Sequence, residues 1–151
     1  MTYVYLVINV DMTGLVTNMS YCLSIDGEQT PVEEFDYRDK EDVILQCFMA
    51  LQNQLASRYN RDHQIVIFDT ESDLLDLWLS MARYKIYPWL KVSPKDTVLN
   101  LGKYLAHRTT TFTGLRKLFN LDSDLSDPET LAAVHKAYKP VLQRPTSYGS
   151  K

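Results

Sequence analysis

The stretch Tyr3–Asp11, YVYLVINVD, is the part of the sequence from which the fold is most directly inferred. Seven of the eight residues from Tyr3 to Val10 are apolar or aromatic, and Asn9 is the exception. A continuous apolar run of this kind, followed by an acid and a polar break that contains Gly14, predicts a β-strand. Asp11 is then either the first residue of a turn or a carboxylate that a strand end presents to a metal ion.

Length and composition favour one cytoplasmic domain with a real core. The chain has 151 residues, of which 45% are hydrophobic, enough for a core without covalent cross-links. Cys22 and Cys47 lie in apolar runs without metal-ligand spacing, so we expect buried thiols in a reducing cytoplasm. No segment approaches the roughly 18 apolar residues of a membrane span. The first apolar run lacks the basic start and cleavage site of a signal peptide.

Positive charge is concentrated in one part of the chain. The net charge is −3, yet the stretch Arg83–Lys117 holds eight Lys or Arg and a single acid, Asp96. Aromatic residues, among them Trp89 and Tyr104, are interspersed with these cations. Cations that neutralise phosphates and aromatics that stack on bases together characterise single-strand-binding surfaces. The alternative is that the aromatics belong to the core while the lysines form a solvated face.

Hydrophobic periodicity predicts an element order of three strands, a helix, a strand and then helices. Strands are expected at Tyr3–Val10, Met19–Ile25, Thr30–Tyr37 and Gln64–Phe68, with a further short strand near Tyr87–Val92. Helices are expected at Lys40–Tyr59, Ser72–Tyr84, from Ser93-Pro94 to about His107, at Thr113–Phe119, and from Ser126 to about Tyr138.

This order predicts an α/β fold with a mixed β-sheet and helices on its faces. The run Gln64–Phe68, QIVIF, is short, continuous and apolar, which is typical of a central, parallel strand. We expect a single domain over residues 1–139, followed by a C-terminal tail at residues 140–151, because Pro140 follows the last helical pattern.

The element order and the positions of several acids resemble the ribonuclease H-like fold, in particular the DEDD 3′–5′ exonuclease superfamily. Asp11 in INVDMTG falls at the first acid of the family's D-x-E pair. Asp73 in VIFDTESDLLDLWL falls at the second-motif Asp, with Phe68-Asp69 where the family has His-Asn. The stretch from Asp96 to Leu101 resembles D-T-L-x-L, TFTGLRKLFNL resembles the short helix that follows, and Asp127 falls at the final Asp.

The chain also departs from the family pattern. Thr13 stands where the second acid of the D-x-E pair belongs, and Asp122 stands where the family has His or Tyr. The family's two Mg²⁺ ions clamp the scissile phosphate and need several carboxylate ligands. The resemblance implies a site for Mg²⁺ or Mn²⁺ in which Asp11, Asp73 and Asp127 are the metal-binding and catalytic residues. An active enzyme would also need a replacement for the missing acid, and Glu33 or Glu34 is the candidate.

The resemblance implies a nucleic-acid-associated protein with an eroded metal site, either a weak 3′–5′ exonuclease or inactive. Single-stranded nucleic acid would then contact cations and an aromatic side chain of the basic stretch. These are Arg83, Lys85, Trp89, Lys91, Lys95, Lys103 and Arg108. A non-enzymatic protein-interaction module on the same scaffold, with a protein partner, is the alternative, and an unrelated α/β fold is a third possibility.

Each acid also has a purely structural explanation. Asp11, followed by Gly14, suits a turn, and Asp73 suits the first turn of a helix, where a carboxylate meets the positive end of the helix dipole. Asp127, directly before Pro128, suits an N-cap. His135 on the last predicted helix is expected at the surface or at a rim.

Overall fold

The computed structural model describes residues 2–37, 40–59, 63–71, 73–85 and 98–142. Its strands are β1 (Thr2–Val10), β2 (Val16–Ile25), β3 (Glu28–Gln29), β4 (Glu33–Phe35), β5 (His63–Ile67) and β6 (Val98–Asn100). Its helices are α1 (Glu41–Tyr59), α2 (Asp73–Arg83), α4 (Gly102–Leu105), α5 (Phe112–Leu118) and α6 (Asp127–Leu142). The predicted order of strands, a helix, a strand and a helix is confirmed up to α2, although the described residues form four strands before α1 where three were predicted.

The strands form one mixed sheet in the order β3-β2-β1-β5-β6, with β4 also paired to β2. β1 pairs antiparallel with β2 and parallel with β5, and β5 pairs parallel with β6. The predicted α/β class, the mixed sheet and the parallel strand over Gln64–Phe68 are thus confirmed. β1 occupies the centre because a strand that is apolar on both faces is best buried between two layers.

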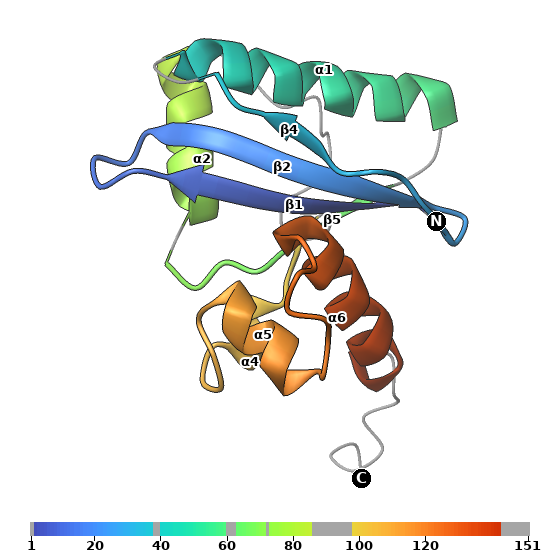
Figure 1. Ribbon diagram of the computed structural model, residues 1–151. Helices are drawn as coiled ribbons and strands as arrows, with labels where there is room; N and C mark the ends of the chain where they lie inside the picture. Colours follow the sequence, from blue (N-terminus) through green and yellow to red (C-terminus); the bar gives the residue numbers. More distant parts are fainter. Residues whose placement is uncertain (1, 38–39, 60–62, 72, 86–97, 143–151) are drawn as a thin grey trace, which may run out of the picture.

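Helices cover both faces of the sheet (Figure 1). On one face Val4, Leu6 and Ile8 of β1 pack with α1 and α2 in a first core. On the other face Tyr5 packs with Val66 and with residues of α4, α5 and α6 in a second core. Successive side chains of a strand point to opposite faces, so the single apolar run of β1 contributes to both cores.

Of the third predicted strand, Thr30–Tyr37, only Glu33–Phe35 is a strand (β4), and the two-residue strand β3 lies just before it. Pro31 lies between them and has no N–H to donate to a ladder, which excludes it from a regular paired strand. Thr30 connects the segment between β3 and β4 to β2. Its hydroxyl accepts a hydrogen bond from the Leu23 N–H at 2.9 Å, and its own N–H donates to the Leu23 carbonyl at 2.8 Å.

The predicted helix from Ser93-Pro94 to about His107 is wrong over residues 98–100, which are strand β6, and it is confirmed only over the short α4, Gly102–Leu105. The partner strand decides this: Val98, Leu99 and Asn100 pair with Ile65, Val66 and Ile67 of β5. Backbone pairing to an available sheet edge outweighs a weak helical pattern. The strand expected near Tyr87–Val92 lies outside the described residues, as does Asp96.

The last helix extends further than its predicted end at about Tyr138, since α6 runs to Leu142 and includes Pro140. At its start the Glu129 N–H donates to Ser126 Oγ at 3.3 Å, and the Ser126 hydroxyl donates to Glu129 Oε1 at 2.6 Å. Ser126, not Asp127, therefore supplies the cap. Within the described parts of the chain, no helix has the length and hydrophobicity that crossing a membrane requires.

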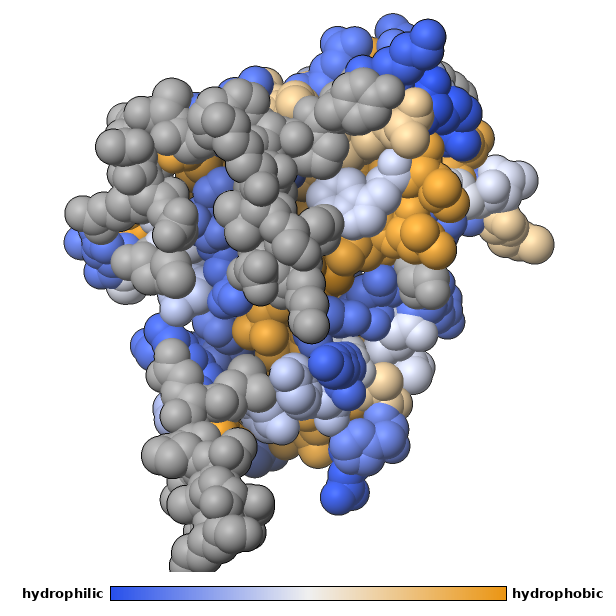
Figure 2. Space-filling model, turned by 180° about the vertical axis from the view of Figure 1, so that it is seen from behind, coloured by the Kyte–Doolittle hydropathy of each residue, from blue (hydrophilic) through white to orange (hydrophobic). Residues whose placement is uncertain are grey.

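Helix α2 has one buried and one exposed row of leucines. Leu77 is fully buried, whereas Leu75 and Leu79 are each 56% exposed. Seen from behind, the molecule carries a hydrophobic area on the side of α2 (orange, upper right in Figure 2). The two rows allow a matched test of the core beneath α2.

We expect Leu77→Ala to lower the free energy of unfolding by about 2–5 kcal/mol, since it opens a cavity in the first core. Leu79→Ala on the same helix should change it by about 0.5 kcal/mol or less, because that side chain is already largely in water. Urea denaturation followed by circular dichroism measures both values. Equal losses for the two variants would contradict this packing of α2.

Candidate functional site

Asp11 organises the turn between β1 and β2. Its Oδ1 accepts hydrogen bonds from the Thr13 N–H at 2.8 Å, the Thr13 hydroxyl at 2.6 Å and the Leu15 N–H at 3.1 Å. The Thr13 hydroxyl bond is the main cause of the lowered pKa of the Asp11 carboxyl. Gly14 follows with φ +88°, which glycine adopts without strain. The carboxylate is thus used within its own turn, as in an Asx-turn.

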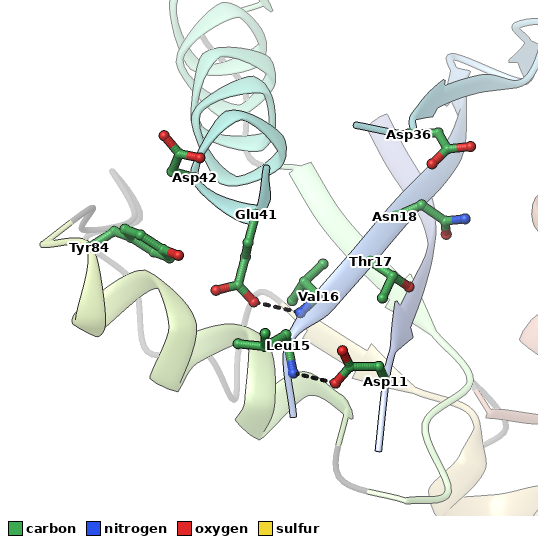
Figure 3. A pocket seen from close by; sticks show the side chains of 9 residues that line it. All are labelled: Asp11, Leu15, Val16, Thr17, Asn18, Asp36, Glu41, Asp42 and Tyr84. Atoms are coloured by element: carbon green, nitrogen blue, oxygen red, sulfur yellow. Dashed lines mark hydrogen bonds between the residues drawn. The ribbon is translucent and has the colours of Figure 1, made fainter. Parts of the chain in front are cut away.

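A cavity of about 620 Å³ opens beside this turn (Figure 3). Asp11, Asp36, Glu41, Asp42 and Tyr84 are among its lining residues. The expected replacement acids do not line it: Glu33 and Glu34 lie on β4 opposite Tyr21 and Ser20 of β2. Of the acids beside Asp11, Glu41 is the buried one.

The Glu41 carboxylate joins three elements of the fold. It accepts hydrogen bonds from the Val16 N–H at 2.5 Å, the Ser80 hydroxyl at 3.0 Å and Arg83 Nη2 at 2.6 Å. The Glu41 side chain is 6% exposed and that of Arg83 48%. Arg83, predicted to contact nucleic acid, therefore holds α2 to the start of α1.

Asp73 and Asp127, two of the three predicted metal ligands, line a second and smaller cavity of about 170 Å³. It lies at the C-terminal ends of the parallel strands β1 and β5, where Asn9 and Phe68 also contribute to its wall. Asp11 lines the first cavity and not this one. The structure thus brings Asp73 and Asp127 to one place with Asn9, and Asp11 to another.

Asp69 supplies the cap of α2. Its Oδ1 accepts from the Glu71 N–H at 3.1 Å and the Asp73 N–H at 2.9 Å, and its Oδ2 accepts from the Leu74 N–H at 3.0 Å. Asn100 fixes the backbone of Asp69, because its amide oxygen accepts from the Asp69 N–H and its amide nitrogen donates to the Asp69 carbonyl. The ends of β5 and β6 are thereby held together beside the cavity.

Asp73, the first residue of α2, has a raised pKa. Partial burial is the largest cause, and the neighbouring carboxylates of Asp69, Glu71 and Asp76 add to it. Burial and like charge thus outweigh the favourable field of the helix N-terminus. This corner of the cavity carries negative charge that would favour a cation.

Asp127 is neutralised by a cation of the protein. Arg116 Nη1 donates to Asp127 Oδ1 at 3.0 Å, to the Leu125 carbonyl at 3.1 Å and to Thr130 Oγ1 at 3.1 Å. The Arg116 side chain is 14% exposed and so is held firmly between α5 and α6. Among the residues that the structure describes, no three His, Cys, Asp or Glu side chains are grouped so as to hold a metal ion.

The predicted nucleic-acid contacts are only partly described. Lys85, Lys103 and Arg108 are exposed. Thr110, two residues after Arg108, lines the cavity of Asp73 and Asp127. Trp89, Lys91 and Lys95 lie outside the described residues.

Sequence reasoning missed four residues of these two sites, namely Asn9, Glu41, Asp69 and Arg116. Asn9 carries a usable signal, since it is the one polar residue in the apolar run of β1. Glu41 and Arg116 do not stand out, because charged residues at helix ends are ordinary in solvent-facing helices. Comparison of the chain with protein-family models, with curated proteins and with solved structures finds no match.

We expect Glu41→Ala to lower the free energy of unfolding by about 2–3 kcal/mol, because the Val16 N–H and the Ser80 hydroxyl lose a buried charged acceptor. Asp42→Ala, at the next position and on the rim of the same cavity, should cost about 1 kcal/mol or less. Chemical denaturation at pH 7 separates the two. A smaller loss for Glu41→Ala than for Asp42→Ala would contradict the joining role of Glu41.

Asp73→Asn should change stability in the opposite direction. Because the folded-state pKa of Asp73 is raised, ionisation of this carboxyl destabilises the folded chain as the pH rises from about 4, the unfolded value. Asparagine removes that penalty, so we expect the variant to be more stable at pH 7 by about 0.5 kcal/mol, as for relief of one screened like-charge contact.

Below about pH 3 the carboxyl is neutral in both states, and the difference between Asp73→Asn and the parent chain should diminish. Denaturant titrations at pH 3, 5 and 7 measure this dependence. A variant that is less stable than the parent at pH 7 would show that the helix dipole outweighs the neighbouring acids.

Proposed function

We propose that this chain is a ribonuclease H-like domain, similar to the DEDD exonucleases, that binds single-stranded nucleic acid without hydrolysing it. The main observation behind this proposal is the cavity at the ends of β1 and β5, which Asp73, Asp127 and Asn9 line together. The Asp11 carboxylate instead accepts hydrogen bonds within its own turn. Support for the fold relationship comes from the element order and from the mixed sheet with helices on both faces.

The cavity favours a different register for the family's D-x-E pair. With the pair laid over Asn9-Val10-Asp11, its first position falls on Asn9, which lines the cavity with the other two acids. The Asn9 side-chain amide donates to Asn18 Oδ1 on the neighbouring strand. A neutral amide then stands where the family has its first carboxylate.

The donor set does not fit a pair of Mg²⁺ or Mn²⁺ ions. Hard divalent cations take mainly carboxylate oxygens, yet Asn9 is neutral and the Asp127 carboxylate is bound by Arg116 at 3.0 Å. Asp73 keeps a carboxylate in a negative environment. One cation could be attracted there, whereas the described residues lack the ligands that a two-metal clamp needs. We therefore place no hydrolytic step at this cavity.

Binding of a single strand is supported by the wall of the cavity and its surroundings. Phe112 lines the cavity and packs edge-on against Phe68, with ring centroids 5.5 Å apart. Arg108 and Lys103 are exposed on the α4–α5 side. Cations can bind the phosphates of a single strand, and a neighbouring aromatic wall can stack on its bases.

A protein-interaction module is the second candidate, and one observation favours it. Leu75 and Leu79 lie one turn apart on α2, and each is 56% exposed. Paired apolar side chains on an exposed helix face are typical of contacts with another protein. This face is separate from the Asp73–Asp127 cavity, so the two candidates can be tested apart.

The test is to measure binding by fluorescence anisotropy with labelled 15-nucleotide oligo(dT) and oligo(rU) that carry no 5′-phosphate. We expect saturable binding that weakens with salt, and Arg108→Ala and Lys103→Ala should each weaken it several-fold. Lys40→Ala, at an exposed lysine just before α1 on the other face of the sheet, is the matched control. Absence of binding would remove the nucleic-acid proposal and leave the interaction module.

Hydrolysis is measured on the same oligonucleotides, labelled at the 5′ end, in Mn²⁺ and in Mg²⁺. We expect full-length product throughout. A ladder that shortens from the 3′ end and is lost in Asp73→Asn would contradict the eroded-site proposal and establish an active exonuclease.

A further inference from the structure

A third cavity, of about 470 Å³, lies at the opposite end of β1 from the Asp73–Asp127 site. Tyr3 and Tyr5 of β1 form one wall, and the second half of α6 forms another. Asp26 and Gly27 of the turn between β2 and β3 also line it, together with Ser24 of β2 and Gln29 of β3. Its volume is within the roughly 300–1,000 Å³ range of small-molecule sites, and nothing in the proposed function uses it.

Lys139 places a fixed positive charge in this cavity. Its Nζ lies 4.7 Å from the centroid of the Tyr3 ring, a cation–π contact. The Tyr3 ring is itself held, because it stacks on Tyr5 with centroids 6.2 Å apart and meets His135 edge-on at 4.8 Å. A long side chain over a packed aromatic ring is more ordered than a freely solvated lysine.

Lys136 adds a second charge on the same side of α6. It is three residues before Lys139, and residues at this spacing share one helix face. Both lysines line the cavity, and Asp26 is the one acid among the lining residues that the structure describes. The cavity therefore has a net positive wall, although the whole chain is acidic with net charge −3.

His135, which the sequence analysis expects at the surface or at a rim, is buried, with 3% of its area exposed. Burial, followed by the charge of Lys139, lowers its pKa to about 4, so the ring is neutral near pH 7. Burial raises the pKa of the Tyr5 hydroxyl, which lies 2.8 Å from His135 Nδ1. A protonated phenol that donates to Nδ1 leaves Nε2–H as the donor of the imidazole.

We propose that this cavity binds a phosphate monoester, with the phosphate between Lys136 and Lys139. The two ammonium groups can each donate charge-assisted hydrogen bonds to the phosphate, and neutral groups of Ser24, Gln29 and His135 can supply further hydrogen bonds. The volume beyond the phosphate accommodates the organic part of the ester. A free nucleotide and the 5′-phosphate end of a nucleic acid share this chemistry.

The test is isothermal titration calorimetry with adenosine 5′-monophosphate and with adenosine. We expect the monophosphate to bind and adenosine to bind at least tenfold more weakly. Lys139→Met and Lys136→Met should each weaken monophosphate binding about tenfold, as expected for loss of a charged hydrogen bond. Lys117→Met, at an exposed lysine of α5 outside the cavity, is the matched control and should bind as the parent chain does.

The two lysine variants also guard against loss of folding. Lys136 has no contact with the Tyr3 ring among the ring contacts of the described residues, so Lys136→Met tests the charge even if Lys139→Met disturbs the aromatic packing. Thermal unfolding of each variant reports that packing. Equal binding of adenosine and its monophosphate, no binding of either, or unchanged binding by Lys136→Met would overturn the proposal.

A pair of decathymidylates, with and without a 5′-phosphate, separates the two sources of the ester. Preference for the phosphorylated strand, lost in Lys136→Met, would identify nucleic-acid ends as the source, whereas binding of the mononucleotide alone would identify free nucleotides. Binding of the unphosphorylated strand that survives both lysine substitutions would support the proposed single-strand site and contribute nothing to this one. The two proposals can therefore fail independently.

Discussion

The pairing of β1 on both of its edges is the constraint on which the rest of the structure depends. One edge receives the antiparallel hairpin partner β2, and the other receives β5, which is parallel and returns through α1. A central strand must bury both faces, and alternate residues such as Leu6 and Tyr5 enter separate cores. Helices on both sides of the sheet follow from this double burial.

The same strand separates the sites along its length. Its C-terminal end, next to that of the parallel strand β5, brings Asn9 to the cavity of Asp73 and Asp127. Its start brings Tyr3 and Tyr5 beneath α6, where lysines and a buried histidine gather. The electrostatics of the two ends therefore differ: the pKa of Asp73 is raised by burial and nearby carboxylates at one end, and the Lys139 ammonium lies over the Tyr3 ring at the other.

Two buried or largely buried charges, Glu41 and Arg116, are committed to structure. Glu41 accepts from α2 and β2 at once, and Arg116 binds the carboxylate of Asp127 while it also bonds to the Leu125 carbonyl. Buried charges of this kind need partners, and the partners come from elements distant in sequence. A charged residue's role therefore depends on which elements the fold brings beside it, as Arg83 illustrates.

The sequence by itself determined the class of the fold, because apolar periodicity reports burial: β1, α1 and β5 were each evident from local pattern. It also indicated that acids such as Asp11 lie at turns of the chain. Only the tertiary structure decided that residues 98–100 form a strand, since the free edge of β5 lies far away in sequence. It likewise decided that Asn9, and not Asp11, lines the same cavity as Asp73 and Asp127. Which cavity a side chain lines depends on how the strands pack against α2, α5 and α6, and the local sequence pattern does not contain that information.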